Sequence, residues 1–300
     1  MKWVRRWSKT HKAWYHFNPT TGKSKWDPQK QEEEVSTFYD GQSSRKSTER
    51  PEALNRACKM NNALKAALIH VAGGMLPPTM PLAVLDLCCG KGGDLHKFTK
   101  EAGLVFYRGI DISPASIAEA RRRATGLIVN AEFVAVDIMQ LSDFRGPYSL
   151  VSCQFAMHYM WKSAATAEHL ISRVSAALCR GGLFIFTVPD AARVHQELSN
   201  KTRWEVTPYC RVSSAEPITS LRPAFGHVVH YRLQGLVNLP EYLVPFYSVE
   251  ALAERHGMVL EFKKNLTRLK PDIPPVLAKV ARDADDKLAQ LYICACFRKC

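Results

Sequence analysis

Five short apolar runs, separated by stretches with helical periodicity, constrain the fold of this sequence most strongly. The runs are AVLDLC (83–88), VFYRGID (105–111), AEFVAVD (131–137), YSLVSCQF (148–155) and GLFIFTV (182–188). Helical patterns lie between them, near 92–101, 114–124 and 163–179. Strands that alternate with helices predict an α/β fold, in which a mostly parallel, doubly wound sheet carries helices on both faces.

The rest of the chain divides by composition. Residues 1–30 are rich in tryptophan, and 31–50 are polar and Ser/Thr-rich, as is typical of a linker. The α/β domain therefore spans 51–300. Within it, the strand and helix pattern loosens into an insertion near 200–245. A helix near 247–256 and strands at 259–265 (VLEFKKN) and 291–297 (LYICACF) are expected to follow.

Charge and cysteine usage limit the class of protein. The net charge of +13 favours an anionic partner, and residues 1–30 alone hold eight Lys or Arg against one acid. Nine irregularly spaced cysteines in a long chain indicate free thiols in a reducing compartment. The tail CACFRKC lacks a second ligand pair, so we expect no zinc there. MKWVRRWSK has no apolar core of a secretory signal, and no stretch predicts a membrane span.

The stretch VLDLCCGKGGDLHKF (84–98) breaks a buried strand into a glycine-rich loop. Ligands of doubly wound sheets bind at the carboxyl ends of the strands. Gly90, Gly92 and Gly93 allow the backbone to approach a ligand closely there. Adjacent cysteines cannot both bind one metal ion without strain, so Cys88 and Cys89 are interpreted as small packing residues.

Three ligands compete for this loop. A phosphate loop of the form GxxxxGK[ST] and the dinucleotide motif GxGxxG both require spacings that the loop lacks. S-adenosylmethionine remains, because Asp111 ends the second strand near its ribose diol and Asp137 ends the third near its adenine amino group. The alternative is that these aspartates only cap helices.

The motifs together resemble those of eukaryotic mRNA cap guanine-N7 methyltransferases. DLCCGKGGDLHK resembles the first motif of that family, and MNNALK (60–65) resembles the Asn-Asn-x-x-Lys segment before the first strand. CQFAMHYMW (153–161) and GLVNLPEYLVPF (235–246) resemble the His-Tyr and Pro-Glu motifs. LYICACF matches the last, tyrosine-bearing strand. The resemblance covers about 51–300 and implies a class I methyltransferase sheet with an antiparallel last strand and a cap-pocket insertion.

The resemblance also implies roles for individual residues. Those implied to contact S-adenosylmethionine, whose product is S-adenosylhomocysteine, are Lys65, Asp86, Cys88, Gly90, Asp111, Asp137, Gln154 and Tyr159. Those implied to contact the cap are Asn61, Asn62, Lys91, Lys97, Arg123, His158, Glu241 and Tyr292. Cys88 departs from the family, which usually has glycine there.

Guanine chemistry is compatible with these residue types. Glu241 can accept from the N1 and N2 donors of guanine, and a neutral His158 can donate to O6. Lys91, Lys97 and Arg123, expected at strand ends and helix starts, would face the triphosphate. Because N7 carries a lone pair at neutral pH, we expect no catalytic acid or base and no metal, only positioning.

WVRRWSKTHKAWYHFNPTTGKSKWDP (3–28) resembles a WW domain, a small three-stranded β module. By that resemblance, Tyr15 and Trp26 would form the proline groove, while Arg6, Ser8 and Lys9 would bind a phosphate. The implied ligand is a phospho-Ser/Thr-Pro peptide, such as the C-terminal tail of RNA polymerase II. The alternative is a basic aromatic module that binds RNA without specificity.

Together these features favour a nuclear mRNA cap guanine-N7 methyltransferase that acts on GpppN-capped RNA. Two other functions stay open from the sequence. One is a methyltransferase for another base or a small molecule, which the Asn-Asn, His-Tyr and Pro-Glu motifs disfavour. The other is a phosphopeptide-binding adaptor with a decayed transferase domain, which the intact Asp111, Asp137 and Lys91 disfavour.

Overall fold

The computed structural model of the protein describes residues 4–8, 13–20, 22, 24–26, 35–41, 51–279 and 286–300. The chain forms two compact units, Met1–Arg45 and Lys46–Cys300. In the part that the structure describes, no helix is long and apolar enough to cross a membrane.

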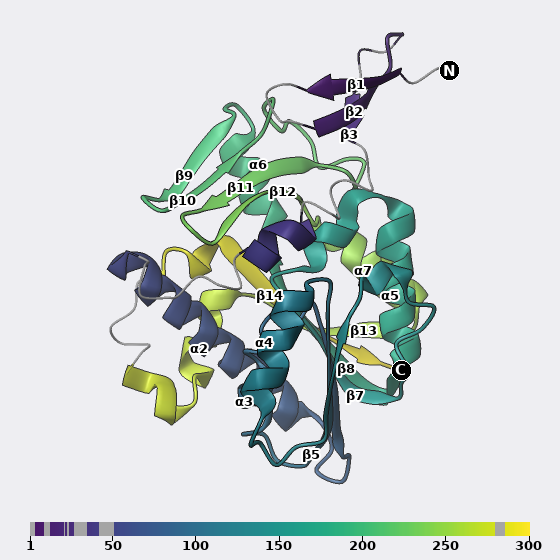
Figure 1. Ribbon diagram of the computed structural model, residues 1–300, viewed down its shortest axis with the longest axis vertical. Helices are drawn as coiled ribbons and strands as arrows, with labels where there is room; N and C mark the ends of the chain where they lie inside the picture. Colours follow the sequence, from purple (N-terminus) through teal and green to yellow (C-terminus); the bar gives the residue numbers. More distant parts are fainter. Residues whose placement is uncertain are drawn as a thin grey trace. The chain divides into compact units, whose positions relative to one another are not determined.

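The second unit is built on a seven-stranded sheet with the order β13-β14-β8-β7-β4-β5-β6 (Figure 1). Its strands are β4 (Leu82–Leu87), β5 (Leu104–Asp111), β6 (Ala131–Ala135), β7 (Tyr148–Gln154), β8 (Leu178–Pro189), β13 (Met258–Asn265) and β14 (Tyr292–Lys299). Neighbouring strands are parallel except at β14, which is antiparallel to both β8 and β13. The expected mostly parallel sheet with an antiparallel last strand is confirmed.

Helices cover both faces of this sheet, because its strands are apolar on both sides. Helices α2 (Glu52–Met75), α3 (Leu95–Phe98) and α4 (Pro114–Ala124) pack on one face, and α5 (Ala164–Ala177) and α7 (Phe246–Arg255) on the other (Figure 1). Local chemistry fixes the helix starts. Ser113 caps α4 ahead of Pro114, and Ser163 forms a capping box with Thr166 at α5.

The helix expected near 92–101 is wrong in extent, since α3 spans only Leu95–Phe98. The preceding residues form turns, with φ of +53° at Gly90 and +66° at Gly92. A right-handed helix cannot contain these conformations. The glycines therefore lengthen the loop after β4 at the expense of the helix.

The insertion after α6 (Ala191–Leu198) is a second, antiparallel sheet with the order β12-β11-β10-β9 (Figure 1). Its strands are β9 (Arg203–Thr207), β10 (Cys210–Ser213), β11 (Val228–Leu233) and β12 (Val237–Tyr242). Along β11, exposed and buried residues alternate strictly. One face of this sheet is therefore solvated and the other packs on the core.

The first unit contains a three-stranded antiparallel sheet of β1 (Val4–Ser8), β2 (Ala13–Phe17) and β3 (Ser24–Trp26). The turn between β2 and β3 is closed by Asn18, whose side chain accepts from the Thr20 N–H and whose carbonyl accepts from the Gly22 N–H. Residues 35–41, inside the segment expected to be a linker, are helical.

Candidate functional site

The carboxyl edge of the parallel sheet gathers most of the expected site residues. Strands β4, β5 and β7 end there at Leu87, Asp111 and Gln154. Because β14 is antiparallel, its first residue, Tyr292, pairs with Pro189 at the end of β8 and lies at the same edge. The strand order reverses between β4 and β7, because β5 and β6 follow β4 on one side while β7 and β8 lie on the other, and doubly wound sheets bind ligands at such a switch point.

Cys88 begins the loop after β4 with φ of +58°, in the left-handed region that favours glycine. The loop is pinned to β5 by two hydrogen bonds, from the Cys89 N–H to the Ile110 carbonyl at 3.0 Å and from the Gly90 N–H to Asp111 Oδ2 at 2.8 Å. Any residue other than glycine is therefore held in a strained backbone conformation at this position.

Replacing Cys88 with glycine should leave the free energy of unfolding within about 0.5 kcal/mol of wild type, although the thiol packs against the core. Relief of the left-handed conformation contributes about 1–2 kcal/mol, and this offsets the added entropy of glycine in the unfolded chain, about 0.5–1 kcal/mol, and the lost contacts of the thiol. Urea unfolding measures the difference. Cys89→Gly is the matched control and should destabilise, because Cys89 has no positive φ. A Cys88→Gly protein less stable by more than about 1 kcal/mol would contradict the strain at this residue.

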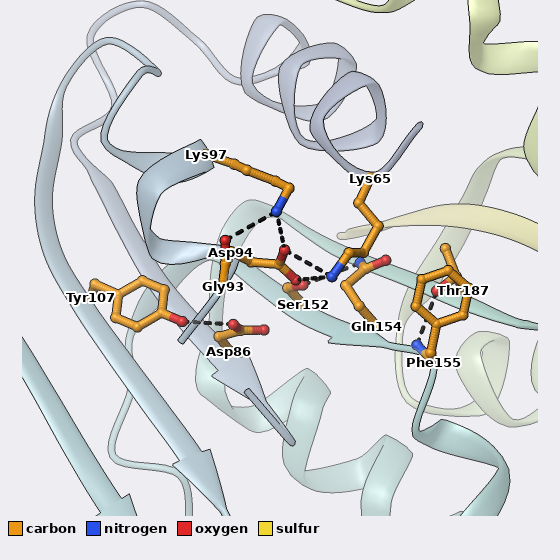
Figure 2. A network of polar contacts seen from close by, with 10 residues as sticks. All are labelled: Lys65, Asp86, Gly93, Asp94, Lys97, Tyr107, Ser152, Gln154, Phe155 and Thr187. Carbon is orange, nitrogen blue, oxygen red and sulfur yellow. Dashed lines mark hydrogen bonds and ion pairs between the residues drawn. The ribbon is translucent and has the colours of Figure 1, made fainter. Parts of the chain in front are cut away.

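A buried carboxylate at the end of the glycine-rich loop lies between two lysines (Figure 2). Asp94 is 2.9 Å from Lys65 Nζ of α2 and 2.7 Å from Lys97 Nζ of α3. Burial alone would raise the pKa of Asp94, but the two ammonium groups lower it to about 2. Burial in turn lowers the pKa of Lys97, against the effect of Asp94. Asp94 therefore stays ionised and fixes both lysines.

Asp86 lies within β4 and is 1% exposed. Burial, and then the nearby Asp94, raise its pKa to about 7, although Tyr107 donates to its Oδ2 at 2.6 Å (Figure 2). A carboxyl group with such a pKa changes its charge near neutral pH. Perturbed acids of this kind cluster at functional sites.

Asp111 and Asp137 each bond to nearby backbone N–H groups. Asp111 Oδ1 accepts from Ser113 at 2.9 Å, in addition to the bond from Gly90, and Asp137 Oδ1 accepts from Met139 at 2.9 Å. Capping is thus one function of both carboxylates.

Several buried polar atoms at this edge have no hydrogen-bond partner among the described residues. They are Asn61 Oδ1 on α2, Gln154 Oε1 at the end of β7, and both ring nitrogens of His158. Gln154 Nε2, in contrast, donates to Ser152 at 3.1 Å (Figure 2). Native proteins rarely leave such atoms unpaired, so these atoms point to a polar ligand.

His158 and Glu241 face each other from the 3-10 helix Met157–Lys162 and from β12. His158 Nε2 is 3.5 Å from Glu241 Oε2, and the two residues are 3% and 4% exposed. Burial lowers the pKa of His158 to about 3 and raises that of Glu241 to about 8. Near pH 7 the pair is largely uncharged, and it offers donors and acceptors to a third group.

Aromatic contacts join these elements. The Phe155 ring meets Tyr292 edge-on at 4.8 Å, and Lys65 Nζ lies 5.7 Å from the Phe155 ring centre. Phe155 itself has φ of +57°, and its N–H donates to Thr187 Oγ1 at 3.0 Å (Figure 2). Tyr159 stacks at a tilt on His158, with ring centres 4.3 Å apart.

The three cationic residues expected at the cap site differ in their positions. Lys97 forms an ion pair with Asp94, and Lys91 is half-buried within the glycine-rich loop. Arg123 lies in the last turn of α4 and pairs with Glu119 at 2.7 Å, so its expected place at a strand end or helix start is wrong. The parallel strands end, and the helices that follow them start, at the carboxyl edge of the sheet. The C-terminal end of α4 therefore lies toward the opposite edge. Asn62 is exposed on α2.

Two residues at the site escaped the sequence analysis. Asp94 organises Lys65 and Lys97, and the signal for it was the acid that closes Gly-Lys-Gly-Gly-Asp. Phe155 links α2 to β14, and it stands in the Cys-Gln-Phe part of a motif from which only Gln154, His158 and Tyr159 were selected.

In the first unit, the backbones of Tyr15 and Trp26 are direct partners in the β2–β3 register, and Arg6 is the partner of Tyr15. The Arg6 guanidinium lies 4.3 Å from the Phe17 ring centre. Ser8 ends β1, and Lys9 lies outside the described residues.

Comparison with known proteins gives this site a family context. A family model described as the mRNA (guanine-N(7))-methyltransferase domain matches residues 23–273. The chain is 34% identical over 230 residues to mRNA cap guanine-N(7) methyltransferase 1 of Arabidopsis thaliana, covering 69% of this chain and 60% of that protein. It is 32% identical over 275 residues to mRNA cap guanine-N(7) methyltransferase of Meyerozyma guilliermondii, covering 75% of this chain and 47% of that protein. The chain thus spans about half the length of these relatives.

Solved structures resemble the chain in fold alone. An S-adenosylmethionine-dependent methyltransferase from Clostridium acetobutylicum superposes with a TM-score of 0.53 at 13% identity, covering 89% of this chain and 98% of that one. Magnesium protoporphyrin IX methyltransferase from Synechocystis, solved with its cofactor bound, gives 0.52 at 13% identity, covering 92% and 99%. The seven-stranded arrangement is therefore that of class I methyltransferases.

Proposed function

The chain belongs to the mRNA (guanine-N7)-methyltransferase family, and on that premise we propose that it methylates N7 of the guanine in GpppN-capped RNA, with S-adenosylmethionine as methyl donor. The observation that carries this proposal is the buried His158–Glu241 pair. The two ring nitrogens of His158 have no hydrogen-bond partner among the described residues. Capped RNA also suits the net charge of +13. Since caps are added to nuclear transcripts, we place the protein in the nucleus.

The residues at the sheet edge fit S-adenosylmethionine, which supplies an electrophilic methyl group when bound. Asp111 would hold the ribose diol, Asp137 the adenine amino group, and Gln154 would use its unpaired Oε1. The amino-acid end of the cofactor would lie along the loop that begins at Cys88, beside Lys65. The other residues proposed for this part of the site are Asp86, Gly90 and Tyr159.

The guanine base would contact both His158 and Glu241. A carboxylate on Glu241 would accept from the N1 and N2 donors, and the neutral imidazole would donate to O6. N7, which needs no deprotonation, is thereby left free to attack. These contacts supply position and a dry environment, so no general base is assigned.

The remaining cap contacts are proposed from the family match. Asn61, with its unpaired Oδ1, and the exposed Asn62 lie next to each other on α2, and Tyr292 begins β14. Lys91 and Lys97 are the cations proposed for the triphosphate, and for Lys97 this requires sharing the carboxylate of Asp94. Arg123, which lies in the last turn of α4 and pairs with Glu119, is directed away from this edge of the sheet and is assigned no cap contact.

A substrate comparison tests the proposal. The protein should transfer labelled methyl groups from S-adenosylmethionine to GpppG-capped RNA, and not to ApppG-capped RNA or to RNA already methylated at N7. Equal transfer to the ApppG-capped RNA would instead favour a methyltransferase for another base. Binding of the cofactor without any transfer would favour an adaptor with a decayed transferase domain.

The pKa of Glu241 predicts how cap affinity depends on pH. Guanine donors require the carboxylate, whereas burial raises the pKa of Glu241 to about 8. Affinity for GpppG should therefore rise about tenfold between pH 6.5 and 8.0 and then level off. His158 stays neutral throughout, because burial lowers its pKa to about 3. Fluorescence titration measures the change. The same slope in Glu241→Gln would exclude Glu241 as its source.

For the first unit we propose a WW-like module, spanning residues 1–30, that binds phospho-Ser/Thr-Pro peptides such as those of the RNA polymerase II tail. Its support is the three-stranded sheet, with Tyr15 opposite Trp26 and the Asn18 turn. Arg6, Ser8 and Lys9 are the residues proposed for the phosphate. Phosphorylated Ser-Pro peptides should bind the full chain at least tenfold more tightly than unphosphorylated ones. Equal, salt-sensitive binding would favour a non-specific RNA-binding module.

A further inference from the structure

A buried hydroxyl pair connects the insertion sheet to the proposed cap site. The hydroxyl groups of Tyr231 in β11 and Tyr292 in β14 are hydrogen-bonded to each other, and the two residues are 3% and 6% exposed. The Cys210 thiol of β10 donates to the Tyr231 oxygen at 3.4 Å. Two neighbouring strands of the insertion sheet therefore meet the last strand of the main sheet at three linked polar groups.

The register of the insertion sheet places Tyr231 and Glu241 on the same face. In the insertion sheet, Tyr231 is opposite Val212 and Leu239, while Glu241 is opposite Val229, two residues before Tyr231. Cross-strand partners and alternate residues share one face of a sheet. Tyr231 and Glu241 thus lie on the same, core-facing side.

The number of available hydroxyl hydrogens indicates which group donates in each of these hydrogen bonds. Tyr231 has one hydroxyl hydrogen, and its polar partners among the described residues are Cys210 and Tyr292. A thiol sulfur is a weak acceptor, so the Tyr231 hydroxyl donates its hydrogen bond to the Tyr292 oxygen. Only one hydrogen fits between two hydroxyl oxygens, and the hydrogen of Tyr292 must point elsewhere.

Resting on the proposed function, we infer that Tyr231 is a positioning residue, which turns the Tyr292 hydroxyl hydrogen toward an acceptor oxygen of the bound guanosine nucleotide. Tyr231 itself touches no substrate in this arrangement. Its effect passes through Tyr292, which the Phe155 ring holds from the other side.

The hydroxyl groups retain their hydrogens at neutral pH. Burial raises the pKa of Tyr231 and of Tyr292 well above 10, and Cys210 and Glu241 also raise that of Tyr292. A donor directed in advance contributes to substrate affinity without a reorganisation cost.

The test is a double-mutant cycle with Tyr231→Phe and Tyr292→Phe, measured as KM and kcat for GpppG-capped RNA. Losing one directed hydrogen bond should raise KM about fivefold in Tyr231→Phe. The value of kcat and the KM for S-adenosylmethionine should stay near wild type, which a merely structural role would not predict. The double variant should match Tyr292→Phe alone, since the effect passes through Tyr292.

Tyr247→Phe is the matched control, because it removes an exposed hydroxyl that donates to the Leu221 carbonyl at 2.9 Å. It should leave the KM unchanged. An unchanged KM in Tyr231→Phe, or additive effects in the double variant, would overturn the inference. If Tyr231→Phe does not fold, Cys210→Ala replaces it. That variant keeps both rings and should raise KM about twofold, and no change would again overturn the inference.

Failure of the proposed function is distinguishable from failure of the inference. If the wild-type protein methylates no capped RNA, the proposed function fails. Direct binding of GpppG, followed by fluorescence, then decides the role of Tyr231. Weaker binding by Tyr231→Phe supports the positioning role, and equal binding overturns it.

Discussion

Replacing Glu241 with glutamine should lower kcat/KM for methylation of capped RNA about 100-fold or more while the protein stays folded. The amide retains the shape of the side chain, but its NH₂ group faces guanine donors or its single oxygen serves only one of them. Two charge-assisted hydrogen bonds are worth about 1.5–3 kcal/mol each. The loss follows because Glu241 is 4% exposed and water cannot replace it.

Stability separates this effect from misfolding. Burial raises the pKa of Glu241 from 4.5 to about 8. The folded chain therefore holds a proton that the unfolded chain releases, and the stability of the neutral form is lost as pH rises through that window. Glu241→Gln has no such proton, so at pH 8 it should unfold at a urea concentration equal to or above that of wild type.

Glu250→Gln, an exposed change on α7, is the matched control and should retain full activity. Activity of Glu241→Gln within threefold of wild type would remove Glu241 from the cap site.

The second large effect concerns Asp94. Asp94→Asn should lower the free energy of unfolding by about 3 kcal/mol, because it leaves Lys65 and Lys97 facing each other without the carboxylate that neutralises them. Binding of S-adenosylmethionine should weaken at least tenfold, as Lys65 loses its position. Urea unfolding and calorimetric titration measure the two effects.

The acid dependence of the Asp94 contribution has a defined sign. Its pKa in the folded protein is about 2, below the ordinary 3.8. The contribution is therefore complete above pH 4 and is lost as the pH falls toward 2. The exposed Asp143→Asn provides the control. Equal stability of Asp94→Asn and wild type at pH 7 would show that the two lysines do not depend on Asp94.

Much of the fold was predictable because buried parallel strands are apolar along their whole length. The runs AVLDLC, VFYRGID and YSLVSCQF were assigned as strands on that basis, and the parallel topology then brought their ends to one edge. Tyr292 joined them through the antiparallel last strand implied by the family resemblance. These predictions depend on local pattern and simple topology.

The parts of the fold and of the site that could not be predicted from the sequence depend on tertiary packing. The short strands between 203 and 242 read as an irregular insertion, because only one face of their sheet is buried and the loops interrupt the alternation. The clamp at Asp94 and the Tyr231–Tyr292 pair join residues 29 and 61 positions apart. No periodicity signals such contacts. The helix near 114–124 was predicted with the extent of α4, but Arg123 was misplaced because its role was taken from the family resemblance and not from its position in that helix.

The most direct test of the account is the site of methylation. The protein is incubated with S-adenosylmethionine and GpppG-capped RNA, and the cap is released by nuclease and separated by chromatography. The account predicts 7-methylguanosine in the wild-type reaction and its absence in the Glu241→Gln reaction. A methyl group on any other atom, or equal amounts of 7-methylguanosine with both proteins, would contradict it.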